Sequence, residues 1–234
     1  MKTLLTFLFL GLLVTHVNAQ NFFQDADDFF VKYASDGRVD YADLKKNPAD
    51  LNALVTQIAE LNLNNKRVTA DFMKAFYINA YNILVIKQVV DRYPIYGPLK
   101  VDGFFDGISH KVMGKELTLN QLEKETLYTQ FPDPRLHFVL VCAAKGCPPI
   151  APFAYTPTGL SEALDDRTRH VLNLEGFIRV KKKRVELSQI FDWYKTDFER
   201  TSDSDIAFIN KYRDQKIDLK TSLGYYQYDW SLNE

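Results

Sequence analysis

Residues 69–93 read TADFMKAFYINAYNILVIKQVVDRY, and this stretch has the strongest helical pattern in the chain. Its apolar and aromatic side chains run round every face of a helix, which is the pattern of a helix buried on all sides. Thr69 is suited to cap the first turn, and Pro94 would end the helix because proline disfavours helical geometry in the residue before it. We therefore expect a central, buried helix over 69–93.

Two asparagines interrupt the apolar part of this helix. Between Ala75 and Ile86 every residue is apolar or aromatic except Asn79 and Asn82, which are three residues apart and so share one face. A buried amide needs hydrogen-bond partners. Each asparagine therefore either tethers the backbone of a loop or holds a catalytic side chain, and the sequence leaves both interpretations open.

The rest of the chain alternates helical and extended patterns. Hairpins are expected at turns over 113–115 and 181–183, and 135–142 (RLHFVLVC) has the short apolar run of a central strand. The aromatic stretch 225–233 (YYQYDWSLN) is expected to dock on the body of the protein. The predicted fold is α+β, a single helix-rich domain with a small antiparallel sheet. Further helices are expected at 22–33, 48–61, 119–129, 158–174, 188–200 and 204–212.

Composition narrows the class of protein. The chain has 234 residues, enough for one large domain with a full hydrophobic core. Its formal net charge is −1, and the basic run Lys181–Arg184 is short enough to be a solvated turn. Binding of nucleic acid needs a broad basic surface. We therefore expect no nucleic-acid partner.

The first nineteen residues have the pattern of a signal peptide. Lys2 supplies a positive charge, an apolar run follows, and the small residue Ala19 fits a cleavage site. We expect 20–234 to be exported as a single domain, periplasmic or secreted, with no integral membrane segment after cleavage. An exported chain usually meets an oxidising compartment, in which a disulfide is stable.

Both cysteines of the chain lie in the stretch HFVLVCAAKGCPP, residues 137–149. In an extended strand His137 and Cys142 would point to opposite faces, with Cys142 directed into packing as a small hydrophobic residue. Cys147 stands between a glycine and two prolines, in a constrained loop that could display its thiol. At the start of a helix the helix dipole would lower the pKa of that thiol.

This pattern suggests a nucleophilic cysteine paired with a histidine. Cys147 would be the nucleophile and His137, ten residues upstream, its general base. A third group must orient the histidine, and Glu123, Asn79 and Asn82 are the candidates. His110 and His170 are interpreted as bystanders on a hairpin and an amphipathic helix.

Other interpretations of the cysteines remain. A Cys142–Cys147 disulfide would close a tight loop, and an even number of cysteines in an exported chain favours it. A redox dithiol usually has two residues between its cysteines, whereas four separate them here. A zinc site made of His137, Cys142 and Cys147 lacks a fourth ligand. We expect neither a metal nor another cofactor.

Several stretches together resemble the domain of unknown function 547 family. The resemblance covers nearly the whole mature chain, with core motifs over 69–200, and RVDYADLKKNPADLNAL (38–54) is similar to bacterial members. The family motif maps onto Asn79, Asn82, Glu123, Asp133, Arg135, His137, Cys142 and Cys147. The stretches that carry the resemblance are FYINAYNILVI (76–86), MGKELTLNQLE (113–123), DPRLHFVLVCAAKGCPP (133–149), LSQIFDWYKTDF (187–198) and YDWSLN (228–233).

Two positions depart from the pattern of the family. Members tend to have serine before the second cysteine, where this chain has Gly146, so a hydroxyl donor near the thiol is missing. The helix after Glu123 often ends in Ile-Leu-Arg in relatives, but this chain has Thr126-Leu127-Tyr128. A substrate-binding role of that arginine would not carry over.

The leading hypothesis is an exported cysteine-dependent hydrolase or acyl-transfer enzyme, similar in chemistry to the papain and transglutaminase class, whose fold it would share. Cys147 would attack a carbonyl carbon, with His137 as base and the loop amides of 145–147 as oxyanion donors. The alternative is a non-catalytic domain that binds a peptide or a glycan and is stiffened by a Cys142–Cys147 disulfide. In either case the ligand is a small molecule, a peptide or a glycan of unknown identity.

Overall fold

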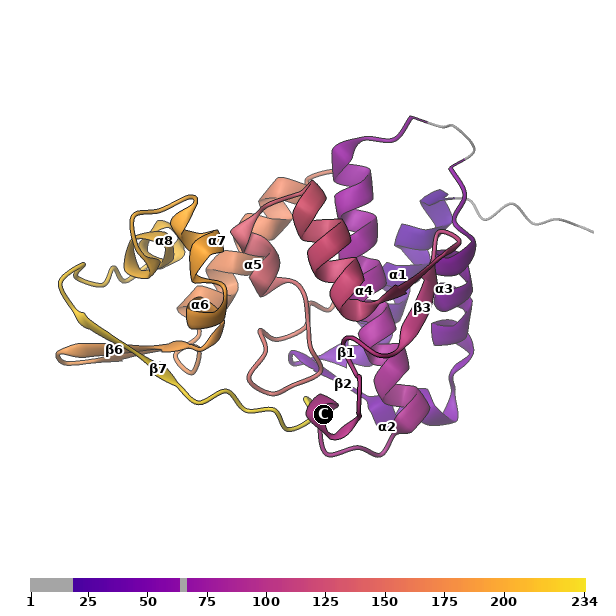
Figure 1. Cartoon of the computed structure of the whole chain (residues 1–234), viewed down its shortest axis with the longest axis horizontal. Helices are drawn as coiled ribbons and strands as arrows, with labels where there is room; N and C mark the ends of the chain where they lie inside the picture. Colours follow the sequence, from indigo (N-terminus) through magenta and orange to yellow (C-terminus); the bar gives the residue numbers. More distant parts are fainter. Residues whose placement is uncertain (1–18, 64–66) are drawn as a thin grey trace, which may run out of the picture.

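The computed structural model describes residues 19–63 and 67–234, as a helix-rich α+β fold with small sheets (Figure 1). The predicted signal peptide, apart from Ala19, lies outside the described residues. Among the residues that are described, no helix is long and apolar enough to cross a membrane. Two hydrophobic clusters form the core, and each is organised by its own set of helices.

Helix α4, Ala70–Arg92, is the centre of the first cluster, as predicted. The Thr69 hydroxyl accepts a hydrogen bond from the backbone N–H of Phe72 at 3.1 Å, so the predicted cap is formed. Helices packed around α4 bury its apolar residues on all sides, which explains why its sequence has no polar face. They are α1 (Ala19–Tyr33), α2 (Tyr41–Lys46), α3 (Ala49–Glu60) and η2 (Gln121–Tyr128).

Two hairpins and a short helix accompany the first cluster. Strands β3 (Ser109–Val112) and β4 (Lys115–Thr118) pair antiparallel around a turn in which Met113 and Gly114 have positive φ, which confirms the predicted hairpin. A second, shorter hairpin lies nearer the N-terminus. A short 3-10 helix precedes β3. These elements are β1 (Ala34–Ser35), β2 (Arg38–Val39) and η1 (Pro98–Lys100).

The second cluster is formed by the C-terminal third of the chain around Phe138, Phe191, Phe198 and Phe208. Its sheet has the order β5-β6-β7, antiparallel between β5 and β6 and parallel between β6 and β7. The described residues therefore hold three small sheets, one of them mixed, where a single antiparallel sheet was expected. The elements are α5 (Leu160–Asn173), β5 (Ile178–Lys181), β6 (Arg184–Ser188), α6 (Ile190–Trp193), α7 (Lys195–Glu199), α8 (Asp205–Tyr212) and β7 (Ser222–Tyr226).

The prediction of a strand over 135–142 is wrong, because no residue of this stretch is in a strand and 139–142 has no regular secondary structure. Pro134–Phe138 is a 3-10 helix, η3. Proline fits the first turn of a helix, and the Asp133 carboxylate accepts the backbone N–H of Arg135 at 3.0 Å. Local capping thus overrides the strand pattern, and His137 lies on a helical turn.

The C-terminal segment, residues 227–234, docks on the body of the protein, as predicted, and it does so across the loop that carries the cysteines. In Figure 1 this yellow segment leaves β7 and runs back to the first half of the chain. The backbone N–H groups of Lys145 and Gly146 donate to the carbonyls of Ser231 and Asp229, each at 2.8 Å. The cysteine loop is therefore held by residues more than eighty positions further along the chain.

Candidate functional site

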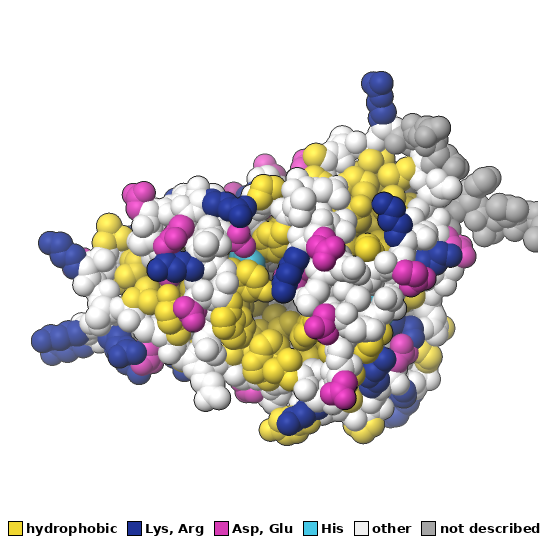
Figure 2. Space-filling view, viewed as in Figure 1, with side chains coloured by type: hydrophobic (Ala, Val, Ile, Leu, Met, Phe, Trp, Pro, Cys, Tyr) yellow, Lys and Arg dark blue, Asp and Glu magenta, His cyan; other side chains and the backbone are white. Residues whose placement is uncertain are grey.

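A cleft of about 540 Å³ opens between the two hydrophobic clusters. On the face shown in Figure 2, hydrophobic side chains gather in the middle of the molecule, between its two halves. A cleft between two packed units is a common place for a binding site. Its walls come from α4, the 99–106 loop, η2, the cysteine loop, α6 and the C-terminal segment.

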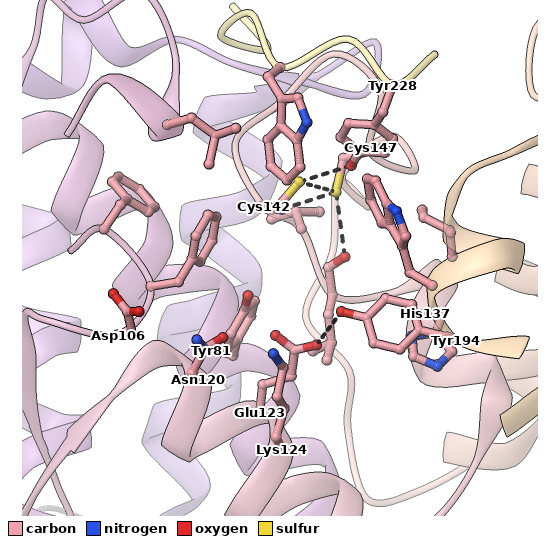
Figure 3. Close-up of a pocket in the computed structure, with 18 of the residues that line it drawn as sticks. Tyr81, Asp106, Asn120, Glu123, Lys124, His137, Cys142, Cys147, Tyr194 and Tyr228 are labelled. Carbon is pink, nitrogen blue, oxygen red and sulfur yellow. Dashed lines mark hydrogen bonds between the residues drawn. The ribbon is translucent and has the colours of Figure 1, made fainter. Parts of the chain in front are cut away.

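Both cysteines line this cleft, and both are free and partly exposed. Their Sγ atoms are 3.0 Å apart, and the Cys147 Sγ also accepts the backbone N–H of Cys142 at 3.0 Å (Figure 3). The disulfide of the alternative hypothesis is therefore not formed. Cys142 also departs from expectation, because it faces the cleft instead of the packed interior.

The loop between the cysteines has an unusual backbone. Ala143 is fully buried and has φ 60°, a left-handed conformation that costs a non-glycine residue about 1–2 kcal/mol. The backbone N–H of Cys147 donates to the carbonyl of Ala144 at 3.1 Å, closing a turn. Cys147 is thus in a turn and not at the start of a helix, so the predicted effect of a helix dipole on its thiol is absent.

Tyr228 supports the thiol pair from the C-terminal segment. Its hydroxyl lies 3.0 Å from the Cys142 Sγ. Burial would raise the pKa of the Cys142 thiol, but its hydrogen bonds with Cys147 and Tyr228 act in the opposite direction and leave this pKa below its ordinary value. The pKa of Cys147 is raised well above its ordinary value, by burial and by the adjacent Cys142. These opposite shifts favour Cys142 as the thiol of the pair that ionises first.

His137 also lines the cleft, but its imidazole is engaged elsewhere. Its side chain is 3% exposed, and its Nε2 atom lies 3.0 Å from Asp197 Oδ2. The hydrogen bond from His137 lowers the pKa of Asp197. The ring is enclosed by Tyr128 and Tyr194, with centroid distances of 4.8 Å and 4.0 Å. Among the described residues, neither cysteine thiol is hydrogen-bonded to the His137 imidazole.

Glu123 lies in the cleft on the π-helix η2, a helix type often found at functional sites. It is largely buried and accepts a hydrogen bond from the Tyr194 hydroxyl at 3.4 Å. Burial and the proximity of Glu123 raise the pKa of Tyr81. The Tyr81 hydroxyl therefore stays protonated beside the carboxyl group of Glu123. Glu123 is thus linked to His137 through Tyr194, while Asp197 makes the direct contact.

Asn79 and Asn82 tether loops. Asn79 donates to the carbonyl of Tyr155 at 2.7 Å and accepts its N–H at 3.0 Å. Asn82 donates to the carbonyl of Val139 and accepts the N–H of Val141, each at 2.9 Å. Both are buried and neither lines the cleft, so of the five predicted site residues the cleft brings together Cys147, His137 and Glu123.

The predicted oxyanion hole does not exist in this form. The backbone N–H groups of 145, 146 and 147 all donate to backbone carbonyls, those of Ser231, Asp229 and Ala144. They are therefore not free to bind a developing oxyanion. The hydroxyl of Tyr228 lies 3.0 Å from the Cys142 sulfur, and either atom can be the donor.

Asp133 and Arg135, which the family motif suggested, form an ion network away from the cleft. Arg135 contacts Asp133 at 2.8 Å and Asp165 at 2.9 Å, and Lys74 also pairs with Asp133. Although burial acts in the opposite direction, the hydrogen bonds from Arg135 and Lys74 lower the pKa of Asp133 to about 2. This network fixes the start of η3.

Sequence reasoning missed the residues that the second half of the chain contributes. Asp197 and Tyr194 share a helical face three residues apart, which was the available signal for a group orienting His137. Tyr128 stacks on His137 with an interplanar angle of 25°. Within the described residues, no group of three or more His, Cys, Asp and Glu side chains is placed to hold a metal ion. Aromatic side chains missed at the cleft are Trp193, Tyr228 and Trp230.

Comparison with protein families identifies one domain. Residues 65–172 match the family described as "Protein of unknown function, DUF547", so a DUF547 domain is present there. The match includes both cysteines, His137 and Glu123 but ends before Asp197 and Tyr228, and it is shorter than the resemblance seen in the sequence. Comparisons with curated proteins and with solved structures gave no match. A papain-like or transglutaminase-like fold therefore stays a prediction.

Proposed function

We propose that the cleft is the active site of a cysteine-dependent hydrolase or acyl-transfer enzyme. The observation that carries the proposal is the contact between Cys142, Cys147 and Tyr228 at the cleft, where the Cys147 thiol and the Tyr228 hydroxyl each lie 3.0 Å from one partly exposed sulfur. A thiolate is the reactive form of cysteine, and donors of this kind favour it. The domain family itself has no known function.

The hydrogen bonds favour Cys142 as the nucleophile. Its sulfur lies 3.0 Å from both the Cys147 Sγ and the Tyr228 hydroxyl, and the pKa of Cys142 is lowered whereas that of Cys147 is raised. The sequence-based choice of Cys147 stays a prediction that mapping of the reactive thiol tests. Whichever cysteine is the nucleophile, the sulfur of the other lies 3.0 Å from it.

The reaction would proceed in two halves. The Cys142 thiolate attacks the carbonyl carbon, a carbon–sulfur bond forms, and the carbonyl oxygen takes the electron pair with the Tyr228 hydroxyl as donor. The leaving group departs with the proton of Cys147, giving a thioester. Water or another acceptor then attacks the thioester, returns a proton to Cys147 and releases the Cys142 thiolate.

His137 enters this proposal as a positioning residue and not as a general base. It is held by Asp197 and packs against Tyr194, whose hydroxyl reaches Glu123 in the cleft. The imidazole therefore sets the position of a cleft wall. Loss of His137 should then alter the affinity for substrate more than the pH dependence of thiol reactivity.

The second candidate is a binding domain for a peptide or a glycan, without the disulfide first expected. An aromatic cluster in the cleft lining favours it: the Trp193 ring stacks on Trp230 at a centroid distance of 5.9 Å and lies tilted against Tyr228 at 5.0 Å. Trp193 is 45% exposed, so it is available to a ligand. Aromatic platforms of this kind bind apolar ligand faces.

Alkylation of the reduced, full-length protein tests the enzyme proposal. Iodoacetamide is applied at several pH values, and intact mass and peptide mapping identify the modified residue. Rapid modification of Cys142 near pH 6, followed by a burst of acyl-enzyme with an activated aryl ester, is expected. If both thiols are alkylated only as fast as those of the urea-unfolded chain, the result would contradict the enzyme proposal and favour the second candidate, a binding domain.

We also propose that the chain is exported after cleavage at Ala19, to the periplasm or the medium. The basis is the charged, apolar and small-residue pattern of the first nineteen residues. Mass spectrometry of the protein from its native source measures the mature N-terminus. Retention of Met1 to Ala19 would contradict this proposal.

A further inference from the structure

The distance between the two sulfur atoms has a chemical meaning of its own. At 3.0 Å, the Sγ atoms of Cys142 and Cys147 need to approach by about 1 Å to reach disulfide bond length. The spacing of the cysteines in the sequence disfavoured a redox pair. A turn, closed by the hydrogen bond from the backbone N–H of Cys147 to the carbonyl of Ala144, removes that objection, because it brings the Cys147 Sγ next to the Cys142 Sγ.

The loop is built to hold this arrangement. Ala143 keeps a left-handed backbone between two fixed points, since its carbonyl accepts the N–H of Asn233 at 3.1 Å and its methyl group is fully buried. Gly146 allows the C-terminal segment to approach, because a Cβ atom there would lie 2.8 Å from the backbone nitrogen of Asp229. Two separate close contacts thus preserve the position of the thiols.

The thiols are also open to a ligand. Both are partly exposed and line the same cleft, whose walls are aromatic and apolar at Phe105, Trp193 and Trp230. A disulfide that only stabilises a fold has no need of a cleft above it. Here the sulfur atoms stand at one end of a cavity of about 540 Å³ (Figure 3).

We propose that Cys142 and Cys147 form a dithiol–disulfide exchange centre, which reduces a disulfide-bonded substrate that enters the cleft through its apolar part. This activity goes beyond acyl transfer and does not depend on it. Thiol–disulfide exchange needs a thiolate, an accessible disulfide and a second thiol, but no oxyanion hole. The occupied amides of the cysteine loop, which weaken the case for acyl transfer, are therefore no obstacle to this reaction.

The exchange balances in two steps. The Cys142 thiolate attacks one sulfur of the substrate R–S–S–R′, a mixed disulfide forms, and R′–S⁻ leaves and is protonated. Cys147 then loses its proton and attacks the Cys142 sulfur, which releases R–S⁻ and forms the Cys142–Cys147 disulfide. Two electrons pass from the protein thiols to the substrate, and the two thiol protons end on R–SH and R′–SH. A small thiol reductant restores the pair.

The test uses the reduced full-length protein and the aromatic disulfide 4,4′-dithiodipyridine. Release of two equivalents of thiopyridone is expected, with loss of two hydrogens from the protein mass and no adduct. The second equivalent should appear at a rate that does not depend on probe concentration, at least about tenfold faster than in the urea-unfolded chain. Cys147→Ser should release one equivalent and keep a thiopyridine adduct on Cys142.

Three results would overturn the proposal. The first is a wild-type protein that keeps two thiopyridine adducts. The second is a release of the second equivalent that is no faster than in the unfolded chain. The third is a Cys142–Cys147 disulfide in freshly purified protein that a reductant cleaves only after the protein is unfolded. The acyl-transfer proposal is judged separately by the burst with the aryl ester. An ester burst without disulfide closure refutes only the exchange activity, and closure without a burst refutes only acyl transfer.

Discussion

The hydroxyl of Tyr228 lies 3.0 Å from the Sγ of Cys142, although 86 residues separate the two in the sequence. This contact joins the DUF547 domain to the segment that follows it, because the family match ends at residue 172. The pKa of the Cys142 thiol is therefore lowered in part by a residue outside the matched domain. A test of the site must include both parts of the chain.

Replacement of Tyr228 by phenylalanine should raise the pKa of Cys142. The ring stays in place while the donor to the thiolate is lost, and a hydrogen bond to a charged group contributes about 1.5–3 kcal/mol, or roughly 1–2 pH units. The pH profile of iodoacetamide alkylation measures this shift. Tyr226→Phe, which removes a hydroxyl that binds the carbonyl of Phe177, is the matched control and should leave the profile unchanged.

Gly146→Ala should displace the C-terminal segment from the thiol pair. The new Cβ would lie 2.8 Å from Asp229 N and 2.9 Å from the Tyr228 ring, so the segment must shift at a cost of about 1–3 kcal/mol. Urea unfolding and the alkylation profile report the two effects. Gly176→Ala is the control, because a Cβ there meets nothing within 4 Å. Equal stability of both variants would contradict the close packing at Gly146.

Asn82→Ala should be strongly destabilising. It leaves the carbonyl of Val139 and the N–H of Val141 without their partner, at roughly 2–5 kcal/mol for two buried groups. Thermal and urea unfolding measure the change. The exposed Asn52→Ala on α3 should stay within about 0.5 kcal/mol of wild type. Were Asn82 catalytic and not a tether, the variant would keep its stability and lose activity.

The ion network at Asp133 should make stability depend on pH in the acid range. The folded pKa of Asp133, about 2, is below the unfolded value of about 3.9. Its contribution, on the order of 2 kcal/mol, is therefore present above pH 4 and is lost as the pH falls toward 2. Asp133→Asn should flatten this part of the stability curve, measured by urea unfolding between pH 2 and pH 6.

The matched control for Asp133 is Asp166→Asn. Asp166 is exposed and makes no ion pair in the described part of the chain. Its variant should show the same loss of stability as wild type between pH 4 and pH 2. A curve flattened to the same degree in both variants would show that the network at Asp133 is not the cause.

The sequence predicted the elements that local pattern determines. Helix α4 follows from an apolar run with a cap at Thr69, and the hairpin at 113–115 follows from its glycine turn. It failed where capping competes with the pattern, as at Pro134, which converts the expected strand into a 3-10 helix. Alternation of apolar residues cannot report such competition, because the capping carboxylate lies just outside the apolar run.

The site was predictable only in part, for a similar reason. Cys147, His137 and Glu123 stand out by residue type, and all three line the cleft. Their partners do not, since Asp197 is 60 residues from His137 and the spacing of the cysteines hides a contact between their sulfur atoms. Contacts between distant segments depend on the packing of two hydrophobic clusters, which no short motif encodes.

The docking of the C-terminal segment has a consequence for biosynthesis. A ribosome makes Cys142 and Cys147 before it makes Tyr228, and 86 residues separate Cys142 from its hydroxyl donor. During that interval the nascent chain carries two thiols without the segment that fixes their loop. Translation therefore delivers both thiols before the tyrosine that contacts them, and the hydrogen bond between Cys142 and Tyr228 forms only after residues 227–234 fold back onto the cysteine loop.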